Sequence, residues 1–156
     1  MIRVFACLAL LAAVPAAAVT PAYLDDRSTP QTLIRSYYNA ITRSEYSRAY
    51  SYYPANTLPA FATWSKGYEN TRSVEVLTGK AIADPGAGNI YYNLPVAIRS
   101  VSKAGKVEVF GGCYVLHITN FGMQTEPPYQ PMTIRSGKLS KSTKTLKLAL
   151  PKSCAP

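Results

Sequence analysis

The sequence predicts an α+β fold in which N-terminal helices pack on a strongly curved antiparallel sheet. Two observations carry this prediction. Apolar and aromatic residues recur at helical spacing over 28–53, and from Arg72 onward they change to the alternation that is typical of strands. When helices precede a run of strands, they gather on one face of an antiparallel sheet, because that face is apolar and must be buried.

The first 18 residues are typical of a secretory signal peptide. Arg3 supplies the positive charge, residues 4–14 form an apolar run, and the alanines at 16–18 offer a cleavage site. Cleavage after Ala22 is the alternative. The apolar run is shorter than the roughly 20 residues that a transmembrane helix needs. We therefore expect a periplasmic or secreted bacterial protein with no transmembrane segment after processing.

The sequence predicts a simple domain organisation after the leader. Residues 19–29 are expected to form a flexible N-terminus, and 30–156 one domain. Within that domain, residues 28–53 supply two amphipathic helices separated by a polar break at 42–44. Their expected inner faces hold, in the first helix, Leu33, Ile34, Tyr37, Tyr38 and Ile41 and, in the second, Tyr46, Ala49, Tyr50 and Tyr53, with Ser47, Arg48 and Ser51 facing away.

Tyrosines dominate these inner faces, and two interpretations are open. The tyrosines either form a core whose hydroxyls reach its rim, or they line a cavity and offer it hydrogen bonds. The helix ends are better defined. Thr29 before Pro30 is a typical N-cap pair, with Ser28 and Gln31 as the alternative capping box. Pro54 ends the second helix, because the residue before a proline avoids the α region.

A third helical segment and the first strands follow. The third helix is expected to begin near Thr57 or Leu58, with Phe61, Trp64 and Tyr68 on one side. Alternation then predicts a strand at 73–76, a turn at 84–89 and a long strand at 90–98. Its inner face is expected to hold Ile90, Tyr92, Leu94, Val96 and Ile98, and Pro95, on the other parity, predicts a bulge or an edge.

The later strands are separated by a hairpin turn at 102–106. Gly111 and Gly112 predict a β-bulge that bends the sheet and shifts the inner face to Tyr114, Leu116 and Ile118. Further alternation, which predicts more strand, occurs at Met132 and Ile134 and at Leu146, Leu148 and Leu150.

Two cysteines, Cys113 and Cys154, remain after the leader is removed. An even count in an oxidising compartment predicts one disulfide, which would pin the C-terminal tail to a strand. Two cysteines and a single histidine are too few for a structural zinc site, so neither a metal nor a cofactor is expected.

The formal net charge is +9, and the excess of lysine and arginine is concentrated beyond residue 101. On an exported protein, such charge favours anionic envelope components such as cell-wall polymer, lipopolysaccharide or lipid headgroups. The alternative is a solvated basic surface. Nucleic acid is not an expected partner, because no nucleic-acid-binding motif is present.

No catalytic signature occurs in the chain, so no catalytic residue is predicted. His117 is the only histidine, and alternation places it opposite Leu116, pointing outward if Leu116 points inward. Glu75 and Glu108 alternate with strand valines and are expected to face solvent. No pair of carboxylates has a spacing that indicates acid–base chemistry.

Several segments together resemble a known family. They are TPQTLIRSYYNAITRSEYSRAYSYY, FATWSKGYENT, AGNIYYNLPV, GGCYVL and PPYQPMTI. Over 30–135 the chain resembles the nuclear transport factor 2-like superfamily, which includes SnoaL-like proteins, and in particular its secreted bacterial members. The resemblance implies a cone of curved sheet around the helices. It does not imply one function, because the superfamily holds enzymes, binding modules and assembly domains.

Three functions follow as hypotheses. The first is an exported, non-catalytic binding or accessory domain for a small molecule or an envelope component. Its expected lining residues are Tyr37, Tyr50, Trp64, Tyr68 and Tyr92. The second is an isomerase- or dehydratase-type enzyme of the same fold, which requires an acid or His117 inside the cone. The third is a structural subunit that forms a homodimer through its outer sheet face.

Overall fold

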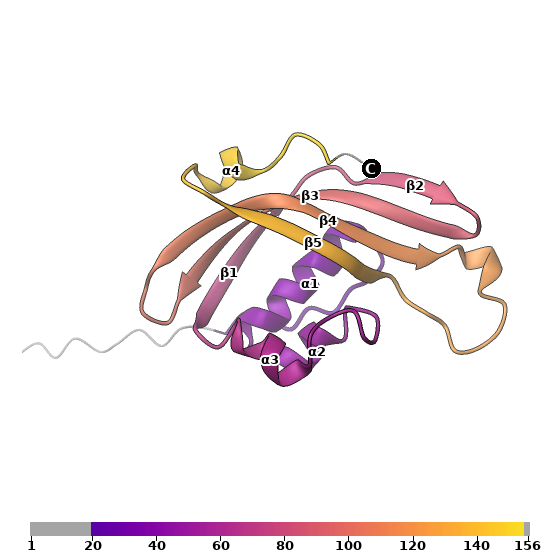
Figure 1. Cartoon of the computed structure of the whole chain (residues 1–156), viewed down its shortest axis with the longest axis horizontal. Coiled ribbons are helices and arrows are strands. Elements are labelled where there is room, and N and C mark those ends of the chain that lie inside the picture. Colours follow the sequence, from indigo (N-terminus) through magenta and orange to yellow (C-terminus); the bar gives the residue numbers. More distant parts are fainter. Residues whose placement is uncertain (1–19, 155–156) are drawn as a thin grey trace, which may run out of the picture.

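The computed structural model describes residues 20–154 as helices packed under one bent antiparallel sheet (Figure 1). The predicted signal peptide lies outside the described residues. The helices are α1 (Pro30–Thr42), α2 (Tyr46–Tyr50), α3 (Phe61–Lys66), the 3₁₀ helix η1 (Phe121–Met123) and α4 (Leu146–Ala149). The strands are β1 (Thr71–Thr78), β2 (Ile82–Gly86), β3 (Asn89–Ser102), β4 (Val107–Thr119) and β5 (Thr133–Ser142). The predicted α+β class is confirmed.

The long strands β3 and β4 form the centre of the sheet, whose order is β1-β3-β4-β5. Two short strands share the free edge of β3: β1 pairs with its second half, and β2 pairs with its first half. Pro95 lies where β1 has ended and β2 has not yet begun, so its missing N–H leaves no ladder bond unmade. Figure 1 shows the sheet arching over α1.

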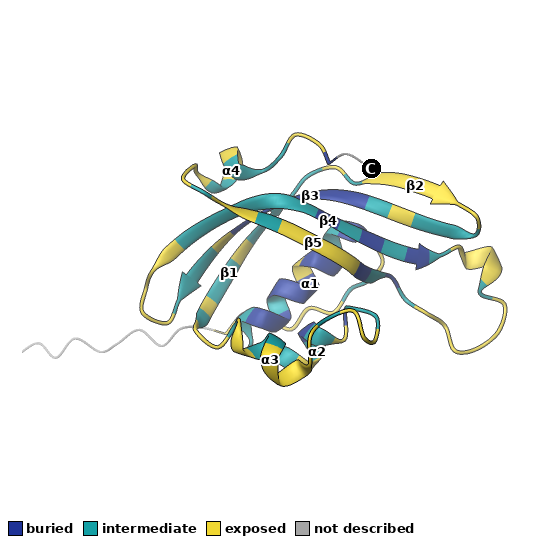
Figure 2. Ribbon diagram, in the orientation of Figure 1, coloured by how far each residue is buried: buried dark blue, intermediate teal, exposed yellow. Residues whose placement is uncertain are grey.

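The core lies between α1 and the concave face of the sheet (Figure 2). The predicted stripe of α1 is buried. Leu94, Val96 and Ile98 of β3 and Tyr114, Leu116 and Ile118 of β4 pack in the same core, which confirms the predicted inner face of β3 and of the second half of β4. Each large apolar side chain buried in this way contributes roughly 1.5–3 kcal/mol. The fully buried residues of this interface include Leu33, Ile34, Ile41, Leu94, Val96, Leu116 and Ile134.

The helix ends differ in detail from the sequence expectations. Thr29 caps α1 and forms the capping box with Thr32, so the alternative cap at Ser28 is wrong. The helix α2 ends at Tyr50, and the chain then turns, which buries Tyr52 completely beside the first helix. The helix α3 begins at Phe61, after an irregular segment that follows Pro54.

The predicted β-bulge at Gly111 and Gly112 is wrong. The pairing of β3 with β4 runs without a register shift from Asn89–Thr119 to Val101–Val107. The glycines are needed instead because the backbones of α4 and β5 lie too close to β4 for a side chain at these positions. A Cβ on Gly111 would lie 2.0 Å from the carbonyl oxygen of Ala149, and one on Gly112 would lie 2.0 Å from that of Lys138. The register shift occurs on the other side of β4, where β5 pairs with it between Val115 and Leu116.

Two further strand expectations are wrong. Residues 84–86 belong to β2, and the turn is confined to Ala87 and Gly88, which both have positive φ. The alternating leucines near the C-terminus form the helix α4 instead of a strand. Leu146 and Leu150 are half-buried while Leu148 is 68% exposed, because residues four apart share one side of a helical turn as well as one face of a strand.

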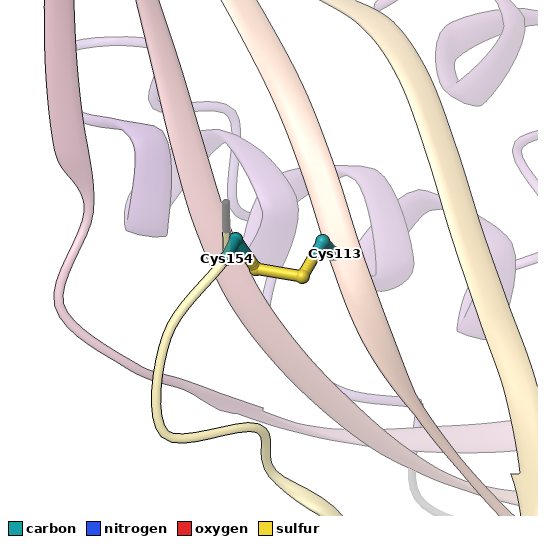
Figure 3. Close-up of a disulfide and its surroundings, with 2 residues drawn as sticks. All are labelled: Cys113 and Cys154. Carbon is teal, nitrogen blue, oxygen red and sulfur yellow. A yellow bond between two sulfur atoms is a disulfide. The ribbon is translucent and has the colours of Figure 1, made fainter. Parts of the chain in front are cut away.

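The predicted disulfide between Cys113 and Cys154 is confirmed (Figure 3). The two Cα atoms lie 5.9 Å apart. The bond fixes the tail to the outer face of β4, and α4 packs on β3 and β4 before it. The tail therefore covers the part of the convex face where Ala97 is fully buried.

Residues 20–29, expected as a flexible N-terminus, contain no helix or strand but are hydrogen-bonded to α1 and α2. The Leu24 N–H donates to Asn39 Oδ1 at 3.1 Å, and the Asp26 N–H donates to Ser36 Oγ at 2.8 Å. Arg48 donates to the Leu24 carbonyl at 2.7 Å and has a side chain that is only 13% exposed. The expectation that Arg48 faces away from the fold is therefore wrong.

Candidate functional site

A cavity of about 340 Å³ opens on the concave face of the sheet, beyond the C-terminal part of α1. Its walls come from α1, from the turn after α3, and from strands β1, β3, β4 and β5. The lining residues are Tyr38, Gly67, Tyr68, Asn70, Thr71, Val74, Ile98, Ser100, Ser102, Lys106, Glu108, Phe110 and Leu139.

The strands supply an apolar floor and a polar rim. The inner parity of β3 is apolar as far as Ile98 and then changes to Ser100 and Ser102. In the adjacent ladders, Ser100 pairs with Val74 of β1 and with Glu108 of β4. The inner face therefore continues past the residues that α1 covers, and there it becomes hydroxyl-rich. This change from apolar to polar side chains leaves a lined depression instead of a closed core.

Two tyrosines that line the cavity, Tyr38 and Tyr68, are hydrogen-bonded to other tyrosines of the core. The hydroxyls of Tyr38 and Tyr114 lie 2.6 Å apart, and those of Tyr37 and Tyr68 lie 2.7 Å apart. The hydroxyl of Tyr46 donates to the Tyr68 carbonyl at 3.2 Å. Burial raises the pKa of Tyr38, Tyr68 and Tyr114 above the usual range. At neutral pH Tyr38 and Tyr68 therefore bring no negative charge to the lining.

An ion-paired carboxylate lies at the mouth of the cavity. Glu108 was expected to face solvent beside inward valines, but the parity is reversed: Val107 is exposed, and Glu108 lines the cavity. Its Oε1 lies 2.7 Å from the ammonium of Lys141 and 2.9 Å from that of Lys106. These hydrogen bonds lower the pKa of Glu108 to about 2. The group is therefore ionised under ordinary conditions and is not suited to donate a proton.

The five residues predicted to line a cavity lie in different places. Tyr68 lines it, whereas Tyr37 is 1% exposed and lies outside the lining set, with its hydroxyl bonded to that of Tyr68. The ring centroid of Trp64 lies 5.0 Å from that of Tyr68 and 5.3 Å from that of Tyr50. The Tyr50 hydroxyl donates to the Pro59 carbonyl, so this ring packs away from the cavity. Tyr92 packs against the core from β3, outside the lining set.

Sequence reasoning missed the polar half of the site. Asn70 and Thr71 follow a turn whose direction only the tertiary structure sets. For Ser100 and Ser102 a signal did exist, because the alternation that places Ile98 inward also places these two serines inward. Phe110 was missed because the expected bulge at Gly111 and Gly112 would have turned it outward.

His117 lies outside this cavity. It is on the opposite face from the buried Leu116, as the alternation predicts. Its Nε2 lies 2.7 Å from Asn89 Oδ1, and its ring centroid lies 4.8 Å from that of Tyr91. Burial, with a smaller effect of Arg135, lowers the pKa of His117. Within residues 20–154, no group of three or more histidine, cysteine or acidic side chains could hold a metal ion.

The chain matches no protein-family model, no curated protein and no solved structure. None of the helices in the described part of the chain is long and apolar enough to cross a membrane. The geometry of the cavity is consequently the observation from which a function can be argued.

Proposed function

We propose that this protein is an exported, non-catalytic binding domain of the nuclear transport factor 2-like type. The proposed ligand is a small uncharged molecule with an apolar body and several hydroxyl or amide groups. The observation that carries the proposal is the cavity of about 340 Å³, with an apolar floor and a rim of hydroxyls. Cavities of about 300–1,000 Å³ with mostly apolar walls and a few convergent polar groups are typical of small-molecule sites.

The size of the cavity restricts the ligand. A volume of about 340 Å³ corresponds to roughly ten water molecules at ~30 Å³ each. An aromatic ring or a single sugar ring with its substituents fits that space. Val74, Ile98 and Phe110 supply the apolar contacts, and Tyr68 and Ser100 supply the hydrogen bonds.

The chemistry of the lining favours binding over turnover. A general acid or base needs a pKa near the working pH. The pKa of Glu108 is far below that range because two lysines pair with its carboxylate. The pKa values of Tyr38 and Tyr68 are above it because these side chains are buried. His117, the only histidine, lies on the opposite face of β4 from the buried Leu116 and outside the cavity lining.

The disulfide and the arrangement of the layers support the other parts of the proposal. A bond such as Cys113–Cys154 persists in oxidising compartments, which agrees with export to the periplasm or the medium. Helix α1 packed on the concave face of a bent antiparallel sheet is consistent with the cone that the sequence resemblance implies.

Fluorescence of Trp64 provides the test. Trp64 is the only tryptophan and its ring packs against Tyr68, so a ligand in the cavity should change its emission. Purified exported protein would be titrated with a panel of phenols, monosaccharides and small cell-wall fragments. We expect at least one saturable change in emission that persists when the salt is raised from about 0.1 M to about 1 M, which shortens the Debye length from about 10 Å to about 3 Å, because uncharged contacts are not screened.

A pair of serine variants makes the test specific. Ser100→Phe places a ring in the cavity and should abolish the titration. Ser140→Phe adds the same ring at an exposed position on the outer face of β5, next to Leu139, and should leave it unchanged. If no compound gives a saturable signal, or if both variants lose it equally, the cavity is not the binding site.

A further inference from the structure

A second cleft, of about 410 Å³, lies at the other end of the sheet from the hydroxyl-lined cavity. It is formed where the N-terminal segment and the turn after α2 meet the end of β4, the start of β5 and the loop between them. Its lining residues are Arg27, Ser51, Pro54, Ala55, His117, Ile118, Thr119, Tyr129, Gln130, Pro131, Thr133 and Arg135.

The lining of this cleft is positively charged. Two arginines, Arg27 and Arg135, share it with His117, and none of the described lining residues is an aspartate or glutamate. One acid lies nearby: a carboxylate oxygen of Asp25 is 3.7 Å from the Arg27 guanidinium. Arg135 has no such pairing among the described ion pairs, so the cleft keeps an excess of positive charge.

Arg27 is held in place before any ligand arrives. Its two terminal nitrogens donate to the carbonyl and the hydroxyl of Ser51 at 3.3 and 3.1 Å. Its guanidinium carbon lies 4.2 Å from the ring centroid of Tyr52, which is fully buried. A side chain that is already ordered loses little conformational entropy on binding, which favours affinity.

Arg135 is positioned by the irregularity in the sheet. The register of β4 and β5 passes from Val115–Ser136 to Leu116–Ile134, so Arg135 is the extra residue of a β-bulge. Bulges redirect a side chain from the alternation of its strand. Arg135 lines the cleft together with Thr133 and His117, which pair with each other directly after the bulge.

His117 adds a third nitrogen donor of variable charge. Because Asn89 Oδ1 is the acceptor at 2.7 Å, Nε2 carries the proton, and Nδ1 becomes a donor only when the ring is protonated. Arg135 is close enough to lower the pKa of His117. An anion between them would reverse this effect, since it favours the protonated ring.

We propose that this cleft binds the oxyanion group of a small organic acid, either a carboxylate or a phosphate, between Arg27, Arg135 and His117. Arginine suits this role because its planar guanidinium forms paired hydrogen bonds with such groups. Pro54, Pro131 and Tyr129 supply apolar surface for the body of the ligand. The site is separate from the cavity of the proposed function and does not depend on it.

The single histidine makes the test direct. Isotope-labelled protein would be titrated with benzoate and, separately, with phenyl phosphate, while the ring signals of His117 are followed by NMR. We expect a saturable shift and a rise in the pKa of His117 at saturation. Arg135, the amide of Asn89 and the ring of Tyr91 are the charged and polar groups shown next to the His117 ring, Arg27 lines the same cleft, and all four are the same with both probes. Tighter binding of phenyl phosphate would indicate a phosphate ligand, and the reverse order a carboxylate.

Charge-matched variants provide the control. Arg135→Gln should weaken binding about tenfold or more, the size expected for one lost hydrogen bond to a charged group. Lys138→Gln removes the same charge from an exposed position on the same strand and should leave the affinity within about twofold. Ser100→Phe, in the other cavity, should also leave it unchanged.

Three results would overturn the proposal. The first is the absence of a saturable His117 shift with both probes. The second is equal weakening by Arg135→Gln and Lys138→Gln, which would mean attraction to the overall charge. The third is unchanged binding in Arg135→Gln. Because Arg135 is exposed, its variant should unfold at the same denaturant concentration as the original protein, which separates lost binding from lost folding.

Discussion

Replacing Tyr114 by phenylalanine removes one hydroxyl from a buried pair. The hydroxyls of Tyr38 and Tyr114 lie 2.6 Å apart, and the two residues are only 4% and 5% exposed. In Tyr114→Phe, the hydroxyl of Tyr38 keeps its position but loses its partner. A buried hydroxyl without a hydrogen bond costs about 1–3 kcal/mol of folding free energy.

A double-mutant cycle measures how much of this loss of stability comes from the interaction between the two hydroxyls. Each single variant, Tyr38→Phe and Tyr114→Phe, should lower the free energy of unfolding by about 1–2 kcal/mol. The double variant should lower it by no more than about 1 kcal/mol, because neither hydroxyl is then left unsatisfied. The double change should therefore cost less than the sum of the single changes by about 1 kcal/mol or more.

Urea unfolding at pH 7, followed by Trp64 fluorescence and by circular dichroism, measures these differences. Tyr23→Phe is the matched control, because the Tyr23 hydroxyl is 3.3 Å from Asp25 on an exposed residue, and its loss should change the free energy by less than about 0.5 kcal/mol. Additive costs in the cycle, or single variants as stable as the original protein, would show that the pair is not a buried unit.

Four other outcomes are expected. Cys154→Ser should lower the free energy of unfolding by about 2–4 kcal/mol, measured by urea unfolding without reductant, because a loop with a sequence separation of 41 is no longer closed. Gly112→Ala should destabilise the sheet by about 1–3 kcal/mol or more, whereas Gly86→Ala, where no atom lies within 4 Å of the new Cβ, should change little; thermal unfolding of both variants compares them. The folded-state pKa of Glu108 is about 2, below its usual 4.5, so its contribution to stability is present above pH 4.5 and is lost as the pH falls toward 2; acid unfolding curves of Glu108→Gln should lack that part of the slope, and identical curves would contradict the ion pairs. The buried tyrosines have raised pKa values, so their contribution is complete below pH 10 and is lost above it; an ultraviolet titration should show them ionising only together with unfolding, and a single normal ionisation step for all tyrosines would disprove their burial.

Much of the fold follows from local patterns in the sequence. The stripe from Leu33 to Ile41 predicts the buried face of α1, since residues three and four apart share one side of any helix. The alternation through Leu94 predicts the inner face of β3 in the same way. A prediction of secondary structure from the sequence was wrong where one pattern of apolar residues fits two structures. Leucines at alternate positions 146–150 fit a strand and also a single helical turn, and the chain forms the turn.

The candidate sites were less accessible to sequence reasoning. Tyr68 was identified because aromatic spacing after α3 is a local signal. The polar rim was not, because Asn70 and Ser100 become neighbours only when the turn after α3 folds against β3. Arg48 was placed on the solvent side because its own helix presents it there, whereas the N-terminal segment covers it with the carbonyl of Leu24.

The sequence by itself determined the buried stripe of α1, the inner face of β3 and the pairing of Cys113 with Cys154, and it narrowed the N-cap of α1 to two residues. These features depend on periodicity, on one capping hydroxyl and on there being two cysteines after the leader. The tertiary structure alone decided where the cavity opens, why Gly112 must lack a side chain, and which arginines share a cleft with His117. Those outcomes depend on distances between segments far apart in the chain, and such distances are set by packing and strand register, which no local pattern specifies.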